Sequence, residues 1–283
     1  MSEKGTSPFE PFFLSSPHGR LFSVYFPPSL RKPPLGGVLF VPPFAEELNK
    51  ARRQMSLQAR ALAGLGYGVL IVDQYGTGDS DGAFGEATWE SWQAGLNSAI
   101  AWLIERGMAR ISLVAVRLGA LLTMDYLQQY SHDVDNIVLL QPVSSGKLYM
   151  TQFLRLRTAA EVLQGQKGGA VAKLRSELSE GKLVEIAGYE INPDLFFAIE
   201  EKDLVKITAP DDSRISIIEV TNSPGGANSP MIKKLVETWQ LAGANSQGYA
   251  VAGEQFWATP EISIAKDVIS LTADLIGGIN NES

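Results

Sequence analysis

Short, continuously apolar stretches alternate with amphipathic helical stretches along most of this chain, and this alternation constrains the fold more than any other feature. The apolar stretches are GGVLFV (36–41), YGVLIV (67–72), ISLVAV (111–116), NIVLL (136–140) and RISIIEV (214–220). Strands that lack polar alternation are buried on both faces, as in parallel sheets covered by helices. The alternation therefore predicts an α/β fold with a mostly parallel sheet.

The connecting segments complete this prediction. The first two β-rich pieces, PFFLSS (11–16) and GRLFSVYFPP (19–28), read as an antiparallel hairpin. Helices are predicted from apolar spacing and capping residues, with Thr88 as one N-cap. They cover residues 46–66, 85–107, 118–130, 231–243 and 260–278.

The alternation stops near residue 146 and resumes near residue 213. The intervening segment has a helical pattern and a higher share of charged residues, as in TQFLRLRTAAEVLQ and GGAVAKLRSELSEGK. We therefore predict a core interrupted by an inserted helical cap. The predicted boundaries are 1–145 for the first part of the core, 146–212 for the cap and 213–283 for the second part.

Composition excludes several classes of function. The formal net charge is -7, from 24 Lys and Arg against 31 Asp and Glu, so no basic face for nucleic acid is expected. The chain has no cysteine, which excludes disulfides and thiolate chemistry, and we expect no metal site and no cofactor. The stretch MSEKGTSPFEPFF does not resemble a secretory signal, and no apolar run is long enough to span a membrane. We therefore expect a cytoplasmic protein.

The order of elements resembles the α/β-hydrolase fold, a mostly parallel twisted sheet flanked by helices. In that fold a nucleophile lies on a sharp turn between a strand and a helix, followed along the chain by an acid and then a histidine. Here the turn is Ala115-Val116-Arg117-Leu118-Gly119. A guanidinium stays protonated and cannot attack a carbonyl. A Ser-His-Asp triad is therefore not expected at this turn.

The other two triad positions also lack the required residues. The loop TNSPGGANSP (221–230), where the acid is expected, has no carboxylate, and Asn228 is the nearest substitute. The loop expected to hold the histidine contains Phe256 and Trp257. The only histidines, His18 and His132, lie upstream of both loops.

Two glutamates follow the strand that would supply the oxyanion hole. The sequence VPPFAEE (41–47) contains two prolines, which have no N–H to donate, and then Glu46 and Glu47. Acidic residues in a first helical turn suit the helix dipole without any further role. However, a partly buried arginine needs a partner, and this loop faces the elbow in α/β hydrolases. We therefore predict an ion pair between Arg117 and either Glu46 or Glu47.

The segments VPPFAEELNKARR, DQYGTGDSDG, ATWESW, VRLGALL and QPVSSGKLYMTQFLRLR together resemble the second type of exosortase-A-system-associated hydrolase. This bacterial family is named for its genomic association with exopolysaccharide and protein-sorting loci, and the resemblance covers most of residues 17–261. It implies that arginine at the elbow belongs to the family pattern. The word hydrolase then describes the fold, because fold alone does not determine function.

Three functions remain open from the sequence. The first is a non-catalytic binding protein for a small anionic or glycan-related ligand, with Arg117 as the anchor and Glu46, Glu47, Phe44 and Trp257 around it. The second is an unorthodox hydrolase of an ester or related bond, in which Glu46 or Glu47 activates water and Arg117 stabilises the oxyanion. The third is a structural partner for proteins of an export assembly, using the cap surface.

Overall fold

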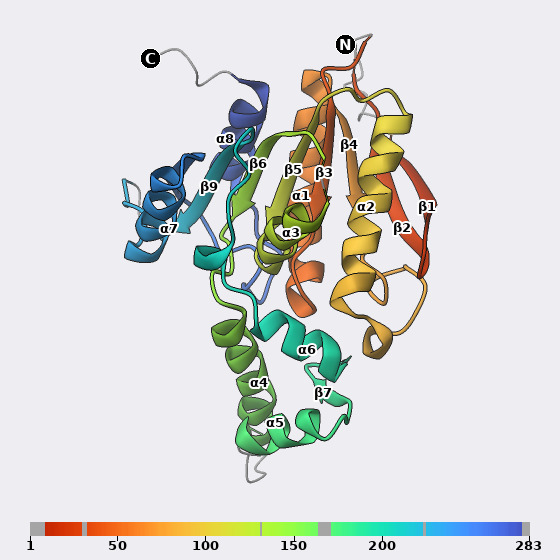
Figure 1. The fold of residues 1–283 in the computed structure, drawn as a ribbon, viewed down its shortest axis with the longest axis vertical. Coiled ribbons are helices and arrows are strands. Elements are labelled where there is room, and N and C mark those ends of the chain that lie inside the picture. Colours follow the sequence, from red (N-terminus) through yellow and green to blue (C-terminus); the bar gives the residue numbers. More distant parts are fainter. Residues whose placement is uncertain (1–8, 30–32, 131, 164–170, 223–224, 279–283) are drawn as a thin grey trace.

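The sheet has eight strands in the order β1-β2-β4-β3-β5-β6-β9-β10 (Figure 1). A computed structural model describes residues 9–29, 33–130, 132–163, 171–222 and 225–278. Strands β1 and β2 form the predicted antiparallel hairpin, β2 is antiparallel to β4, and the other neighbours are parallel. The strands are β1 Glu10–Ser16, β2 Gly19–Phe26, β3 Gly37–Val41, β4 Gly68–Val72, β5 Ile111–Val116, β6 Val134–Leu140, β9 Arg214–Thr221 and β10 Asn245–Ala252.

Helices cover both faces of this sheet, as its apolar strands require. Helices α1 (Glu46–Leu65) and α8 (Lys266–Gly277) pack together on one face. Helices α2 (Trp89–Glu105), α3 (Leu118–Gln129) and α7 (Pro230–Leu241) lie on the other face. Two clusters of buried apolar side chains, one on each face, form the core. The predicted cap of α2 is present, since the Thr88 hydroxyl accepts a hydrogen bond from the backbone N–H of Ser91.

An inserted segment lies between β6 and β9, beyond the carboxyl ends of the central strands (Figure 1). A β-bridge between Ser145, which precedes α4, and Asp203, which precedes η2, brings the two ends of this segment close together. The segment contains α4 Gly146–Leu163, α5 Val171–Ser179, β7 Val184–Ile186, β8 Tyr189–Ile191, α6 Pro193–Glu200 and the 3-10 turn η2 Leu204–Lys206.

A buried carboxylate joins this insertion to the core. Asp125 of α3 accepts hydrogen bonds at Oδ2 from Trp89 Nε1 (2.7 Å) and Gln93 Nε2 (2.9 Å), both on α2. Its Oδ1 accepts a hydrogen bond from Lys202 Nζ at 3.0 Å, and Lys202 follows α6. Both carboxylate oxygens therefore have charge-assisted or indole donors, as a buried charge requires.

Two local elements differ from the prediction. The antiparallel hairpin β7–β8 lies in a segment predicted to be helical, because its two strands have only three residues each and give a weak alternating signal. Helix α8 begins at Lys266 instead of residue 260. The Gln54 side chain explains this start, because its amide exchanges two hydrogen bonds of 3.0 Å with the backbone N–H and C=O of Ala265. This pairing holds residue 265 outside the helix.

None of the described helices combines the length and the apolar composition needed to cross a membrane.

Candidate functional site

The predicted elbow is present at the end of β5. Arg117 lies between β5 and α3 with φ 55° and ψ -116°, a conformation that L-residues rarely adopt. Ala45 (φ 48°), which directly precedes α1, and Gln141 (φ 43°), which directly follows β6, also have positive φ. Gly119 permits close packing here, since a Cβ at this position would lie 2.6 Å from the carbonyl oxygen of Val41. The sharp turn therefore depends on contact between the first turn of α3 and the loop after β3.

The guanidinium of Arg117 is paired with Glu47. Arg117 Nε and Nη2 donate to Glu47 Oε1 at 3.2 and 3.1 Å, and Nη1 donates to the backbone carbonyl of Gln141 at 3.2 Å. The two side chains are 17% and 10% exposed, so the ion pair is largely buried. The predicted ion pair is confirmed, with Glu47 rather than Glu46 as the partner. Three of the five N–H donors of the guanidinium are thus already used within the protein.

Two aromatic rings flank the same guanidinium. The Arg117 Cζ atom lies 5.2 Å from the centroid of the Trp257 ring and 5.8 Å from that of Tyr149, distances typical of cation–π contacts. Trp257 follows β10, in the loop where the sequence comparison expects a histidine. Tyr149 comes from α4 of the insertion and was not predicted, because the sequence does not reveal how the insertion folds over the elbow.

Phe44 lies at the centre of an aromatic cluster beside this site. Its ring makes edge contacts with Phe84, Trp92, Tyr149 and Phe153 at centroid distances of 5.5, 5.9, 6.0 and 5.1 Å. Two of these rings belong to α4 and two to the core. The cluster therefore packs the insertion against the β3–α1 loop.

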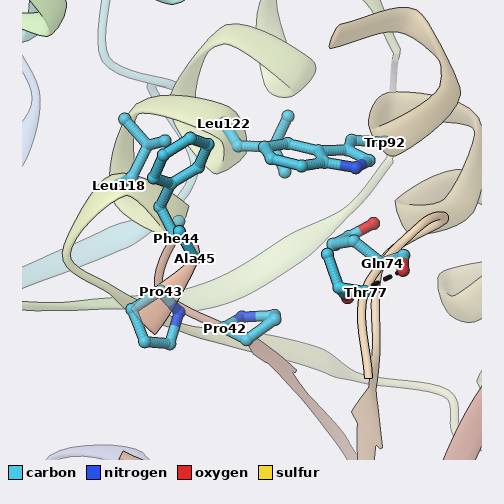
Figure 2. Close-up of a pocket in the computed structure, with 10 residues that line it drawn as sticks. Pro42, Pro43, Phe44, Ala45, Gln74, Thr77, Trp92, Leu118 and Leu122 are labelled. Atoms are coloured by element: carbon cyan, nitrogen blue, oxygen red, sulfur yellow. Dashed lines mark hydrogen bonds between the residues drawn. The ribbon is translucent and has the colours of Figure 1, made fainter. Parts of the chain in front are cut away.

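Phe44 and Trp92 also line a small cavity of about 10 Å³ (Figure 2). A cavity of this size holds about one water molecule. One buried polar atom, Gln74 Oε1, has no hydrogen-bond partner among the described residues, and Gln74 lines the cavity. The lining is Pro42, Pro43, Phe44, Ala45, Gln74, Thr77, Trp92, Leu118, Gly119 and Leu122.

The two glutamates carry buried oxygens that the described residues leave unpaired. Oε2 of Glu46 and Oε2 of Glu47 are both buried without a hydrogen-bond partner of good geometry in the described part of the chain. Burial raises the pKa of Glu47 above its ordinary value, and the charge of Arg117 opposes this shift. Burial also raises the pKa of Glu46, against its own backbone N–H and the charges of Lys50 and Arg117. Burial and the charge of Glu47 hold the pKa of Tyr149 well above its usual value.

Replacing Glu46 with glutamine is expected to remove the contribution of this carboxyl group to the pH dependence of the free energy of unfolding. Because the folded-state pKa of Glu46 lies above its ordinary value of 4.5, its stabilising contribution is complete below pH 4.5. That contribution is lost as the pH rises through the raised folded-state pKa. The free energy of unfolding of Glu46→Gln, relative to the wild type, is therefore expected to increase with pH.

Urea denaturation at intervals between pH 4 and pH 8 measures this difference. Glu90→Gln, at an exposed position of α2, controls for the amide substitution itself. A difference between wild type and Glu46→Gln that shrinks as the pH rises would contradict the expectation.

The remaining residues singled out in the sequence lie away from the guanidinium. Asn228, on the loop after β9, donates to Oε2 of Glu219 in β9 at 3.4 Å. The His18 ring lies beside Tyr75, and His132 Nε2 bonds Asn97 Oδ1 at 2.9 Å. Within the described residues, no group of three or more histidines and carboxylates is arranged to hold a metal ion.

Comparison with known proteins agrees with this architecture. A family model described as serine aminopeptidase, S33, matches residues 33–186. No curated protein matches the chain. The ferulic-acid-bound Est1E from Butyrivibrio proteoclasticus has a TM-score of 0.72 at 11% identity, over 94% of this chain and 98% of that one.

Two further esterase structures show the same similarity. A thermostable carboxyl esterase from Bacillus coagulans, in complex with glycerol, has a TM-score of 0.64 at 12% identity, over 96% of this chain and 98% of that one. The Pyrococcus furiosus esterase PF2001 has a TM-score of 0.60 at 14% identity, over 96% of this chain and 91% of that one. At these identities the similarity establishes a common fold, and the predicted fold class is confirmed.

Proposed function

Since this chain belongs to the serine aminopeptidase S33 family of the α/β-hydrolase superfamily, we propose that it is a non-catalytic member that binds a ligand beneath its insertion. The observation that carries this proposal is the residue at the elbow. The position that presents the nucleophile in this superfamily presents Arg117, whose guanidinium is held by Glu47, by the Gln141 carbonyl and between two aromatic rings.

The residue at the expected histidine position supports the same proposal. Trp257 lies against Arg117 and belongs to the loop in which the fold comparison predicts the histidine, and no histidine follows His132 in the sequence. An imidazole is needed to activate a serine in this type of chemistry. A serine near this site would therefore have no histidine to act as its general base.

The charges around the elbow favour a glycan-related ligand over an anionic one. Glu47 already neutralises Arg117, and Glu46 adds a further carboxylate beside the pair. An anion would find the charge of Arg117 already neutralised by Glu47, whereas a hydroxyl group could donate to the unpaired Oε2 atom of Glu46. We therefore propose a neutral, hydroxyl-rich ligand, with residues 146–212 acting as a cap.

The proposed setting is the bacterial cytoplasm, in the exopolysaccharide and protein-sorting context of the exosortase-associated family. It rests on the sequence segments that resemble that family, including VPPFAEELNKARR and VRLGALL. A ligand related to polysaccharide synthesis or export is consistent with this setting.

Covalent labelling tests the non-catalytic proposal directly. The purified protein is incubated with a fluorophosphonate probe and with p-nitrophenyl esters of two to eight acyl carbons, alongside Arg117→Ser. Neither protein is expected to be labelled or to release p-nitrophenol above the buffer rate, because an elbow serine without an imidazole stays unactivated. A covalent adduct on any side chain of the wild-type protein would overturn the proposal.

The second candidate, an unorthodox hydrolase, is favoured by one observation. Burial raises the pKa of both Glu46 and Glu47, and a general base works best when its pKa approaches the operating pH. Under this candidate, ester or glycoside turnover would increase with pH through the raised pKa and would be lost in Glu46→Gln or Glu47→Gln. Turnover that persists in both variants would exclude these residues as its source.

The third candidate, a structural partner in an export assembly, is favoured by exposed leucines on the insertion. Leu148 and Leu156 of α4 and Leu183 before β7 are 66%, 42% and 51% exposed. Mixing the protein with the purified products of neighbouring genes, followed by size-exclusion chromatography, distinguishes this candidate. Co-elution that Leu148→Ser and Leu183→Ser abolish would favour it.

A further inference from the structure

A groove of about 500 Å³ opens between α1, the loop after β4 and strand β8 of the insertion. We call it the Tyr189 groove. Its volume falls within the range of about 300–1,000 Å³ typical of small-molecule sites. Its lining is Ala45, Leu48, Asn49, Arg52, Thr77, Gly78, Asp79 and Tyr189.

One wall of the groove is built around a buried ion pair. Arg52 Nη1 and Nη2 donate to the two carboxylate oxygens of Asp73 at 2.9 and 2.8 Å, and Asp73 is only 2% exposed. The backbone N–H of Asp79 also donates to Asp73 Oδ2, at 3.4 Å. This wall is therefore fixed by paired charges and backbone contacts before any ligand arrives.

Gly78 allows the loop to close over that ion pair. It has φ 55°, and a Cβ at this position would lie 1.9 Å from Asp73 Oδ2 and 2.5 Å from Arg52 Nη2. Only glycine fits both the backbone conformation and the close approach. The loop thus presents the Asp79 carboxylate and the Thr77 hydroxyl at the groove from a rigid base.

The groove combines the groups that recognise a sugar ring. Asn49 and Arg52 supply N–H donors, since Arg52 Nε is not used by any described residue, and Asp79 supplies a carboxylate acceptor. Leu48 and Ala45 line the groove but are only 4% and 2% exposed, so its apolar surface comes mainly from the Tyr189 ring, against which sugar C–H groups can pack. Hydroxyl groups and C–H faces on one ring match this mixture of polar and apolar groups.

The charges of the groove favour a neutral ligand over an acidic one. The Arg52 charge is balanced by Asp73, which leaves the Asp79 carboxylate uncompensated. Glu46 lies near enough for its charge to raise the pKa of Tyr189, after the larger effect of burial. Glu46 Oε2 is itself buried and unpaired within the described residues, so it can accept a hydroxyl donor.

We propose that the Tyr189 groove binds a neutral saccharide unit, held by Asn49, Arg52 and Asp79 and packed against Tyr189. This inference rests on the proposed function, because it names the ligand class, and the groove is lined by Ala45, the residue that precedes Glu46. It also assigns the insertion a direct role, since Tyr189 belongs to β8.

Saturation-transfer difference NMR on the full chain tests this proposal, with cellobiose, maltose and chitobiose as neutral probes and glucuronic acid as the charged comparison. Saturable binding of at least one neutral disaccharide is expected, with weaker binding of glucuronic acid. Tyr189→Ala and Asp79→Asn are each expected to weaken the affinity at least about tenfold, the equivalent of one lost polar or stacking contact. Tyr249→Ala, on the remote edge strand β10, is the matched control and is expected to leave affinity unchanged.

Three results would overturn the proposal: no saturable binding of any neutral probe, tighter binding of glucuronic acid, or affinity unaffected by both groove variants. Thermal unfolding of each variant checks that it is folded, and Asp79→Asn keeps the test informative if Tyr189→Ala unfolds. The two proposals can fail separately. Covalent labelling by the fluorophosphonate probe refutes the non-catalytic function even if saccharides bind, and missing saccharide binding leaves that function intact.

Discussion

Replacing Glu47 with leucine is expected to lower the free energy of unfolding by about 3–5 kcal/mol, because it leaves the Arg117 charge buried without a partner. The Gln141 carbonyl and the two aromatic rings stay in place, but none of them carries a negative charge. Chemical denaturation at pH 7, with midpoint and slope both fitted, measures the change.

The double variant Arg117→Met/Glu47→Leu tests whether the loss of stability comes from the unpaired Arg117 charge or from the loss of the ion pair itself. Apolar replacement of both partners of a buried pair is often neutral or stabilising, so the double variant is expected to recover most of the loss. Asp135→Ala, which removes a pair with Arg110 whose side chain is 70% exposed, is the surface control and is expected to cost below about 1 kcal/mol. A double variant less stable than Glu47→Leu would contradict this expectation, because Arg117 would then stabilise the fold without Glu47.

Replacing Asp125 with alanine is expected to cost about 3–5 kcal/mol and to loosen the insertion from the core. The substitution leaves the ammonium of Lys202, the indole N–H of Trp89 and the amide of Gln93 without their shared acceptor. Because Lys202 follows α6, the loss acts on the contact between insertion and core. Limited proteolysis is therefore expected to cut the segment 146–202 faster in the variant, alongside a lower unfolding midpoint.

Two variants check the origin of this effect. Lys202→Met removes only the ammonium and is expected to show the faster proteolysis with a smaller loss of stability. Glu180→Ala, in an exposed pair with Lys182 on the same insertion, is expected to change neither measurement. Equal cleavage rates in Asp125→Ala and the wild type would show that Asp125 does not hold the insertion on the core.

The sequence predicted the fold well because its strongest signals are local. Continuous apolar strands and capped helices follow from residue pattern, and the elbow follows from their order. The hairpin β7–β8 was missed, although VEI and YEI alternate apolar and polar residues, because three-residue strands are too short to outweigh a helical neighbourhood. The later start of α8 was not predicted, because it depends on a hydrogen bond between Ala265 and Gln54, which is distant in the sequence.

The site was predicted only in part, and the reasons are geometrical. Charge alone predicted that Arg117 pairs with one of two adjacent glutamates. The choice of Glu47 depends on the direction of the first turn of α1, which the positive φ of Ala45 sets. The carbonyl of Gln141 was not predictable, because any residue has one and only the backbone conformation aims it at the guanidinium. Tyr149 required knowledge of how α4 packs on the core.

The left-handed backbone at Arg117 bears on how activity is assigned to proteins of this architecture. Such a conformation costs about 1–3 kcal/mol, and here it accompanies a residue with no attacking atom. The strained backbone therefore belongs to the turn between β5 and α3, and it does not by itself indicate which side chain the turn presents. A comparison of main-chain geometry alone would group this protein with the esterases, whereas Arg117, Asn228 and Trp257 all depart from the triad pattern.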